Sequence, residues 1–248
     1  MTTAIISKDL LEITTEPYCS LSSSTDLVRW EKQNEVVWNQ THRQRQKYQF
    51  YISAFDFITD NGIIGDYLEF GCHKVRTFRM ALTEARHHNI EWMNFHAFDS
   101  FEGLPPSDES HQLGNRWSGG ALTTTVEQFR KIIRQHGLFP ETVFTYPGFY
   151  DKTLTTDMRN HPHLKGRMAS LICIDCDLYE SAVPVFSFIE EFIQEGTVIY
   201  IDDWWCGYRG NPNKGVSKAF FQFQEKSKFH FAEYLNVGAF GKSFISYT

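Results

Sequence analysis

The chain has 248 residues, of which 42% are hydrophobic and 22% are charged, a balance typical of a globular protein with a sizeable core. A formal net charge of −6 argues against nucleic acid as the main partner, and no apolar stretch reaches the roughly 18 residues of a membrane-spanning helix. Residues 1–20 lack a basic start followed by an apolar block, so we expect no signal peptide. Five cysteines, an odd number, favour a reduced cytoplasmic setting over a disulfide framework.

The first 60 residues predict a helical extension ahead of a main domain spanning residues 61–248. Residues 1–25 are polar and rich in serine and threonine. Thr25 or Asp26 then caps a helical region that runs to about Asp60, with one break expected near residues 39–43. Its aromatic face is larger than the docking of one helix needs and comprises Trp30, Trp38, Tyr48, Tyr51 and Phe55. We therefore expect this extension to cover the substrate side of a site or to pair with another subunit in a homo-oligomer.

A basic run, THRQRQK, lies inside this helical region and carries Arg43, Arg45 and Lys47. Charged residues in such a run usually form a solvated helix surface, and we favour that interpretation here. The alternative is that the run caps an active site or contacts a second subunit.

A glycine turn follows the first expected strand. Residues 67–70 predict a buried strand, Gly71 a tight turn, and the residues from Val75 onward a helix. A strand, a glycine turn and a helix can place a nucleotide-like cofactor on a helix N-terminus. The turn lacks the G-x-G-x-x-G pattern of dinucleotide sites, and the chain contains no G-x-x-x-x-G-K-[ST]. The spacing alone is therefore a weak signal.

A second strand is expected over residues 92–98 and ends at Asp99. An acid at this position suits hydrogen bonding to the two hydroxyls of a ribose, although a helix cap or turn role is equally compatible. The next segment, SFEGLPPSDESHQLGNRWSGG, has the length and composition of loops that cover functional sites. A capping box of Thr124 with Glu127, or of Thr125 with Gln128, then opens a helix. A short third strand is expected over residues 142–146.

The most informative stretch runs from Leu171 to Asp203. It predicts a buried strand, a crossover helix and a second buried strand, because two continuous apolar runs flank a segment whose apolar residues recur every three or four positions. The first run ends in Asp175 and Asp177, and the second in Asp202 and Asp203. Parallel neighbouring strands lie about 5 Å apart, so we expect the four carboxylates to gather at one edge of the sheet.

Carboxylates held this close repel one another, and either a cation or raised pKa values must relieve the repulsion. Oxygen ligands select hard cations, so Mg²⁺ is favoured over Zn²⁺, with Ca²⁺ or Mn²⁺ also compatible. Asp202 and Asp203 would point to opposite faces inside a strand, but both can turn inward where the strand gives way to a loop. Cys173 and Cys176 are expected to be buried structural thiols, because no second cysteine pair completes a metal site.

Two final strands, over residues 229–235 and 239–247, are joined by so short a connection that they must be antiparallel. We expect an α/β fold with a seven-stranded, mostly parallel sheet, an antiparallel terminal hairpin and a helical N-terminal extension. This is the order of elements in the Rossmann-like fold of class I methyltransferases.

Several segments together resemble the macrocin O-methyltransferase family, enzymes that use S-adenosylmethionine and a divalent metal. The resemblance covers roughly residues 60–225 in the same order and spacing. It rests on YLEFG at 67–71, FDSFEGLP at 98–105, PGFYDKTL at 147–154, IDCDLYES at 174–181 and IDDW at 201–204. The family commonly has a glycine pair after its first strand, where this chain has Val75 and Arg76.

The resemblance implies a role for each matching position. The cofactor would be bordered by Glu69 and Gly71 at its methionine end, by Asp99 at its ribose and by Gly148 and Phe149 near its adenine. Phe70, Cys72, Thr77, Ser100 and Phe101 complete the implied cofactor-binding residues. The metal, Mg²⁺ or another hard divalent cation, would be held by Asp175, Asp202 and Asp203. From the residues themselves, Asp175 or Asp177 could accept the proton, and the sequence does not choose between them.

The implied reaction is methyl transfer to a hydroxyl that has a second hydroxyl beside it, on a sugar or polyol-bearing small molecule. Such a substrate could stack on aromatic rings of the flanking loops, namely Trp117, Trp204, Trp205 and Tyr208, although burial in the core is the commoner fate of tryptophan. Two other hypotheses remain open from the residues themselves. One is a metal-dependent hydrolase or phosphatase that uses the strand-end aspartates, and the other is a non-catalytic S-adenosylmethionine-binding protein.

Overall fold

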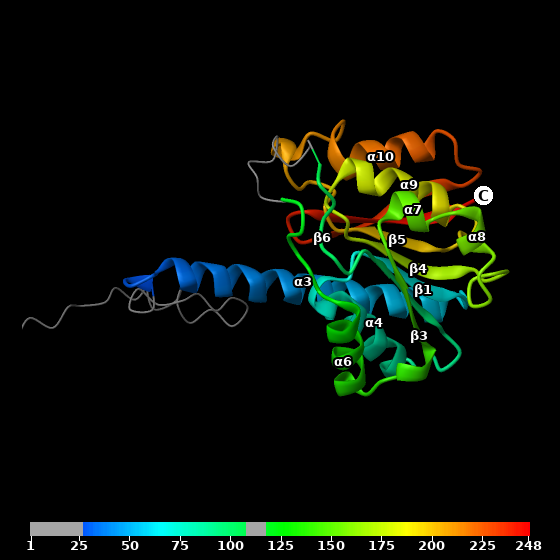
Figure 1. The fold of residues 1–248 in the computed structure, drawn as a ribbon, viewed down its shortest axis with the longest axis horizontal. Helices are drawn as coiled ribbons and strands as arrows, with labels where there is room; N and C mark the ends of the chain where they lie inside the picture. Colours follow the sequence, from blue (N-terminus) through cyan, green and yellow to red (C-terminus); the bar gives the residue numbers. More distant parts are fainter. Residues whose placement is uncertain (1–26, 108–117) are drawn as a thin grey trace, which may run out of the picture. The chain divides into compact units, whose positions relative to one another are not determined.

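A single seven-stranded sheet forms the centre of the fold (Figure 1). The computed structural model describes residues 27–107 and 118–248, and the strand order is β3-β2-β1-β4-β5-β7-β6. The strands are β1 (Asp66–Phe70), β2 (Phe95–Asp99), β3 (Val143–Pro147), β4 (Ala169–Ile174), β5 (Val198–Ile201), β6 (His230–Val237) and β7 (Gly241–Tyr247). The helices are α3 (Lys32–Asp60), α4 (Arg76–His87), α6 (Val126–His136), α7 (Tyr150–Thr153), α8 (Thr156–Arg159), α9 (Tyr179–Ile189) and α10 (Gly215–Gln224).

The pairing of the strands confirms the predicted fold class. Strands β1 to β5 pair in parallel, whereas β7 pairs antiparallel with both β5 and β6. Every residue of β1, β4 and β5 is buried, as expected for parallel strands that are covered on both faces. Thr125 and Gln128 form the capping box of α6, the second of the two predicted pairs.

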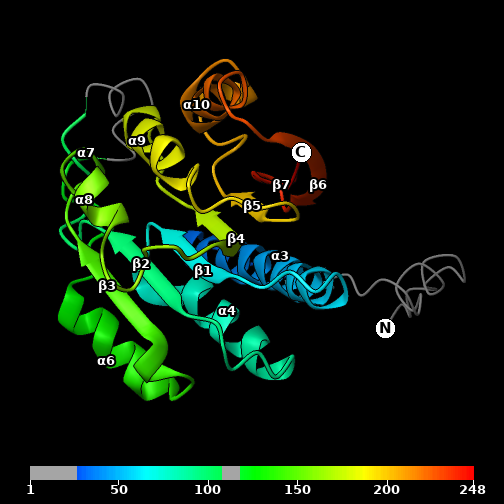
Figure 2. The same cartoon turned by 90° about the vertical axis from the view of Figure 1, so that its right-hand side faces the viewer.

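Helices cover the two faces of the sheet separately (Figure 2). On one face, α4, α6 and the part of α3 from Gln46 onward pack against side chains such as Tyr67 and Tyr200. On the other face, α9 and α10 pack against side chains such as Ile174 and Ile201. Because strand residues alternate between faces, consecutive residues of β4 and β5 belong to opposite cores.

The chain divides into two compact units, one up to Arg45 and the other from Gln46 to Thr248. The predicted division at residue 60 stays a prediction, as does pairing of the extension with another subunit. The predicted break near residues 39–43 is wrong, because α3 is assigned as one helix and contains no glycine or proline. In the first unit Trp30 and Trp38 meet edge to face with ring centroids 6.3 Å apart, and both remain exposed.

The predicted cap at Thr25 or Asp26 lies outside the described residues, as does Trp117. Among the helices that the structure describes, none is both long and apolar enough to cross a membrane.

Gly71 is a position where the fold leaves no room for a side chain. Its φ is +93°, and an added Cβ would lie 1.7 Å from the carbonyl oxygen of Asp175. We therefore expect Gly71→Ala to lower the free energy of unfolding by about 3 kcal/mol or more, because backbone strain and overpacking add. Gly62→Ala is the matched control, with φ +64° and no atom within 4 Å of the added Cβ, and should cost only about 1 kcal/mol. Urea denaturation of both variants measures the difference, and equal losses would contradict the packing argument.

Candidate functional site

Backbone hydrogen bonds beyond the strand ladders join the loops that follow the parallel strands to the neighbouring strands. In each bond the first residue after a strand donates its N–H to the end of the adjacent strand. These bonds run from Gly71 to Phe98 (3.0 Å), from Asp175 to Phe70 (2.8 Å), from Asp202 to Ile174 (2.9 Å) and from Gly148 to Asp99 (3.0 Å). The residues at the carboxyl edge of the sheet are therefore positioned by the sheet itself.

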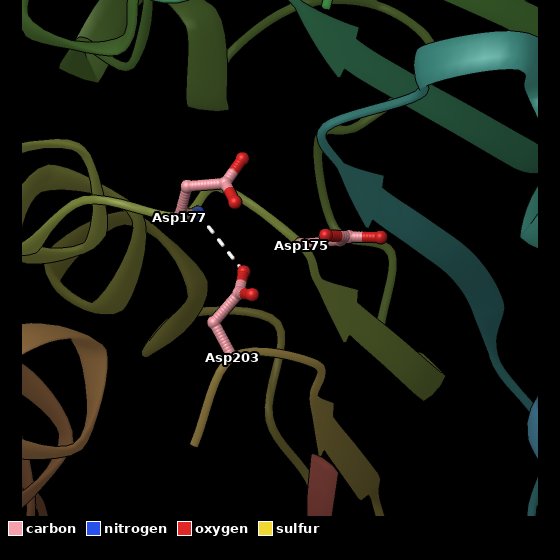
Figure 3. A group of neighbouring side chains, drawn as sticks. All are labelled: Asp175, Asp177 and Asp203. Atoms are coloured by element: carbon pink, nitrogen blue, oxygen red, sulfur yellow. Dashed lines mark hydrogen bonds between the residues drawn. The ribbon is translucent and has the colours of Figure 1, made fainter. Parts of the chain in front are cut away.

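Three carboxylates meet at this edge (Figure 3). One oxygen each from Asp175, Asp177 and Asp203 lies within 4.8 Å of the other two. The backbone N–H of Asp177 donates to Oδ2 of Asp203 at 3.1 Å. Asp177 has a φ of 60°, an unusual conformation for a non-glycine residue. The strained turn and the hydrogen bond together hold two of the three carboxylates in place.

Burial and mutual repulsion act on this cluster in the same direction. The pKa of Asp175 is raised well above its ordinary value, first by burial and then by the charge of Asp202. The pKa of Asp203 is raised by burial and by the charges of Asp177 and Asp175. Three oxygen donors this close together fit a hard divalent cation, which would relieve the repulsion.

Asp202 takes part in a different set of contacts. Its Oδ2 accepts a hydrogen bond from the ammonium of Lys47 at 2.7 Å, and its Oδ1 accepts one from the hydroxyl of Tyr200. Lys47 Nζ also lies 3.4 Å from Oδ2 of Asp175. Burial opposes the charge on Lys47, but the two carboxylates outweigh it and hold the pKa of Lys47 above its ordinary value.

Asp202 and Asp203 make different contacts at this edge, and their shared role as ligands of one cation stays a prediction. Asp202 lies on the same face of the sheet as Tyr200, two residues earlier, whereas Asp203 faces Asp177. The alternation of the strand thus continues past its last residue, Ile201. The geometric cluster contains Asp177 where the predicted ligand set had Asp202, and the metal ligands themselves stay a prediction.

The interpretation of Lys47 as part of a solvated surface is wrong. Its side chain is only 16% exposed and pairs with two carboxylates. The sequence did contain a signal, because Lys47 lies one turn before Phe50 and Tyr51, on the same helical stripe that is buried against the sheet. Arg45, by contrast, is exposed as predicted.

Asp99 ends β2 as predicted and organises the turn beside it. Its two oxygens accept the backbone N–H groups of Cys72 at 2.6 Å and of Phe101 at 2.7 Å. Burial raises the pKa of Asp99, and these hydrogen bonds oppose the rise. Ser100 donates its hydroxyl to the carbonyl of Gly103 at 2.6 Å. The carboxylate therefore joins the turn after β1 to the turn after β2.

Glu69 lies fully buried behind the Gly71 turn. Its carboxylate accepts hydrogen bonds from the hydroxyls of Thr77, at 2.8 Å, and of Tyr67. Burial raises its pKa to about 7, although these donors favour the ionised form. Phe70 is also buried and stacks on Phe98 with ring centroids 4.7 Å apart. Both side chains act as internal packing groups, and their predicted cofactor contacts stay predictions.

The two positions of the missing glycine pair differ in backbone conformation. Val75 has a φ of 55°, in the left-handed region, whereas Arg76 has a φ of −75° and begins α4. Lys74, just before them, is also left-handed with a φ of 58°, and a Cβ in this region costs about 1–2 kcal/mol per residue. Thr124 stabilises this turn, because its hydroxyl accepts the N–H of Lys74 at 2.9 Å and bonds to the ring of His73.

The remaining predicted residues lie close to Asp99 or in the core. Gly148, with a φ of +135°, follows β3, and its N–H donates to the carbonyl of Asp99. Phe149 is the N-cap residue of α7. Cys173 and Cys176 are buried, as expected. Trp204 packs against Phe220 and Phe244 inside the core and is not available for stacking on a substrate, whereas Trp205 and Tyr208 are half-buried.

The raised pKa of Glu69 predicts a pH dependence of stability. An unfolded glutamate has a pKa near 4.5, and the folded value is about 7, so between these values the folded state holds a proton that the unfolded state has lost. The free energy of unfolding must therefore fall as pH rises through this window. Relative to Glu69→Gln, which does not titrate, the wild type should lose up to about 3 kcal/mol between about pH 5 and pH 8. Chemical denaturation across this range tests the prediction, and parallel pH profiles would contradict it.

Residues 27–232 match the family model described as Macrocin-O-methyltransferase (TylF). The chain is 28% identical over 149 residues to 8-demethyl-8-(2,3-dimethoxy-alpha-L-rhamnosyl)-tetracenomycin-C 4'-O-methyltransferase of Streptomyces olivaceus, covering 58% of this chain and 54% of the relative. It is 24% identical over 152 residues to demethyldecarbamoylnovobiocin O-methyltransferase of Streptomyces niveus, covering 59% of this chain and 55% of the relative. The chain thus spans about half the length of the curated relatives it matches.

The structure of the O-methyltransferase NovP matches with a TM-score of 0.65 and 18% identity, covering 81% of this chain and 79% of NovP. At this identity the likeness concerns the fold, which is the class I methyltransferase fold that the sequence predicts. The family match covers most of the chain, and the protein belongs to the macrocin O-methyltransferase family.

Proposed function

We propose that the protein is an S-adenosylmethionine-dependent O-methyltransferase that acts on a hydroxyl of a sugar or polyol-bearing small molecule. Mg²⁺ or another hard divalent cation would hold the acceptor. The observation that carries the proposal is the carboxyl edge of the sheet, where Asp99 lies near the glycine turn and three carboxylates form a cluster. Membership of the family adds the reaction type, and one of the two curated relatives is named for a rhamnosyl-bearing tetracenomycin while the other is named for demethyldecarbamoylnovobiocin.

The cofactor would lie over the turns after β1, β2 and β3. Each oxygen of Asp99 accepts one backbone N–H and retains a further lone pair for a ribose hydroxyl. Gly71 and Gly148, which follow the strands on either side of β2, both have positive φ values and leave no room for a side chain against Asp175 and Thr153. These features support a ribose contact at Asp99, as the position of an acid after the second strand also suggests.

Asp175, Asp202 and Asp203 would hold the divalent cation, and Asp177 lies beside Asp175 and Asp203 in the same cluster. When bound, the cation would orient two neighbouring hydroxyls of the acceptor and make one of them more acidic. Methyl transfer forms an oxygen–carbon bond as the carbon–sulfur bond breaks, and the proton of the hydroxyl must leave. Asp175 or Asp177 would accept this proton.

The cofactor part of the proposal predicts a binding defect in Asp99→Ala. We expect the variant to bind S-adenosylmethionine more weakly by about 1–3 kcal/mol, because hydrogen bonds to a charged group are lost. Glu102→Ala is the matched control, since Glu102 is an exposed acid on the same turn. Calorimetry measures both, and unchanged binding in Asp99→Ala would exclude the ribose role. No binding by the wild type would exclude the methyltransferase proposal.

The proposed cation site predicts a loss of activity in Asp203→Ala. We expect the rate of methyl transfer to fall by at least about a hundredfold, while cofactor binding stays nearly intact because the cation would bind the acceptor. Asp60→Ala, which removes an exposed acid, is the control. The assay is methyl incorporation into vicinal diols and their mono-deoxy analogues, with chelator and after Mg²⁺ is restored. Activity that survives chelation, or that is equal on the analogues, would contradict the cation role. Cleavage of phosphate esters without methyl transfer would favour a hydrolase instead.

A further inference from the structure

Buried hydroxyl groups connect α3 to the end of β1. The hydroxyls of Tyr51, on α3, and Tyr67, on β1, lie 2.8 Å apart, and Tyr67 donates its proton to the carboxylate of Glu69. When Glu69 is ionised, this proton is used, so Tyr51 must be the donor to Tyr67. All three side chains are fully buried, and water cannot replace these bonds. The helix therefore supplies the outermost donor of a hydrogen-bonded series that ends at the carboxylate.

The carboxylate of Glu69 also closes the turn after β1. Its other oxygen accepts the hydroxyl of Thr77 at 2.8 Å, and Thr77 lies in the first turn of α4. The N-cap residue of α4 is Val75, whose side chain cannot accept a hydrogen bond. The bond from Thr77 to Glu69 therefore attaches the start of α4 to the sheet. The buried network that connects α3 to α4 consists of Tyr51, Tyr67, Glu69 and Thr77.

The turn between β1 and α4 needs such support. Lys74 and Val75 have positive φ values, and strained conformations of this kind persist only where the surroundings enforce them. Asp99 and Thr124 accept the N–H groups of Cys72 and Lys74, which joins the turn to β2 and to the segment before α6. The buried network adds an attachment to α3, so three separate parts of the fold hold the turn.

We propose that Tyr51 is a positioning residue for the cofactor site. Through Tyr67 it holds the carboxylate of Glu69 where Thr77 can bind it, and this fixes the backbone over which the cofactor would lie. Helix α3 thus contributes to cofactor affinity through a side chain that is itself fully buried. This inference rests on the proposed function in one respect, namely that the turn after β1 binds S-adenosylmethionine.

Tyr51→Phe removes one hydroxyl and keeps the ring. By calorimetry at pH 8, above the pKa of about 7 of Glu69, it should bind S-adenosylmethionine at least about fivefold more weakly, because hydrogen bonds in series strengthen one another. Tyr234→Phe is the matched control and should stay within about twofold of the wild type. The hydroxyl of Tyr234, on β6, also donates to α3, at the carbonyl of Ser53 (3.3 Å). Unchanged affinity in Tyr51→Phe, or an equal loss in both variants, would overturn the inference.

A double-mutant cycle tests whether Tyr51 acts through Glu69. In Glu69→Gln the carboxylate that Tyr51 supports is absent, so adding Tyr51→Phe should change the affinity by less than about twofold. A general loosening of the structure would instead keep the full loss in both backgrounds, and that result would contradict the proposed route. If Tyr51→Phe does not fold, as judged by circular dichroism, Tyr67→Phe breaks the same series one bond later and takes its place in the cycle.

Amide hydrogen exchange of the ligand-free protein gives a readout that needs no binding. The N–H groups of Cys72 and Lys74 should exchange at least about fivefold faster in Tyr51→Phe than in Tyr234→Phe, because the turn opens more readily. Equal exchange rates would refute the positioning role. Binding by the wild type that is unaltered in Tyr51→Phe would overturn this inference alone, whereas absence of binding by the wild type would exclude the methyltransferase proposal as well.

Discussion

The accumulation of negative charge at one edge of the sheet is the constraint on which the rest of the site depends. Parallel pairing of β4 with β5 places Asp175, Asp177, Asp202 and Asp203 at the same edge, and burial strengthens the repulsion between them. Two features of the fold reduce this repulsion. Lys47 partly neutralises the charges of Asp202 and Asp175. Asp203 instead accepts a hydrogen bond from the backbone N–H of Asp177. A divalent cation would complete the neutralisation where the lysine does not reach.

Backbone strain is concentrated at the same edge. Lys74, Val75, Phe101 and Asp177 all have positive φ values, although none of them is glycine, and such conformations persist only where the surroundings enforce them. The surroundings here are hydrogen bonds, from Lys74 to Thr124 and from Phe101 to Asp99. The turns that would contact a cofactor are therefore held in advance of binding, which reduces the ordering that binding requires.

Much of the fold followed from the sequence because its signals are local. Continuous apolar runs predicted the buried strands, and the acids at the strand ends predicted which loops would form the edge. The errors concern contacts between distant segments. Lys47 and Asp202 are 155 positions apart, so a helical basic run gave no indication of its partner. The position of Asp177 in the carboxylate cluster depends on a turn with a positive φ, which no pattern in the sequence predicted.

The central claim is that a divalent cation binds among the carboxylates at the carboxyl edge of the sheet when the cofactor is present. The most direct measurement is anomalous diffraction from crystals of the protein grown with Mn²⁺ and S-adenosylhomocysteine. The account predicts a manganese peak in contact with Asp175 and Asp203. A cofactor-bound crystal with no manganese peak at these carboxylates would contradict it.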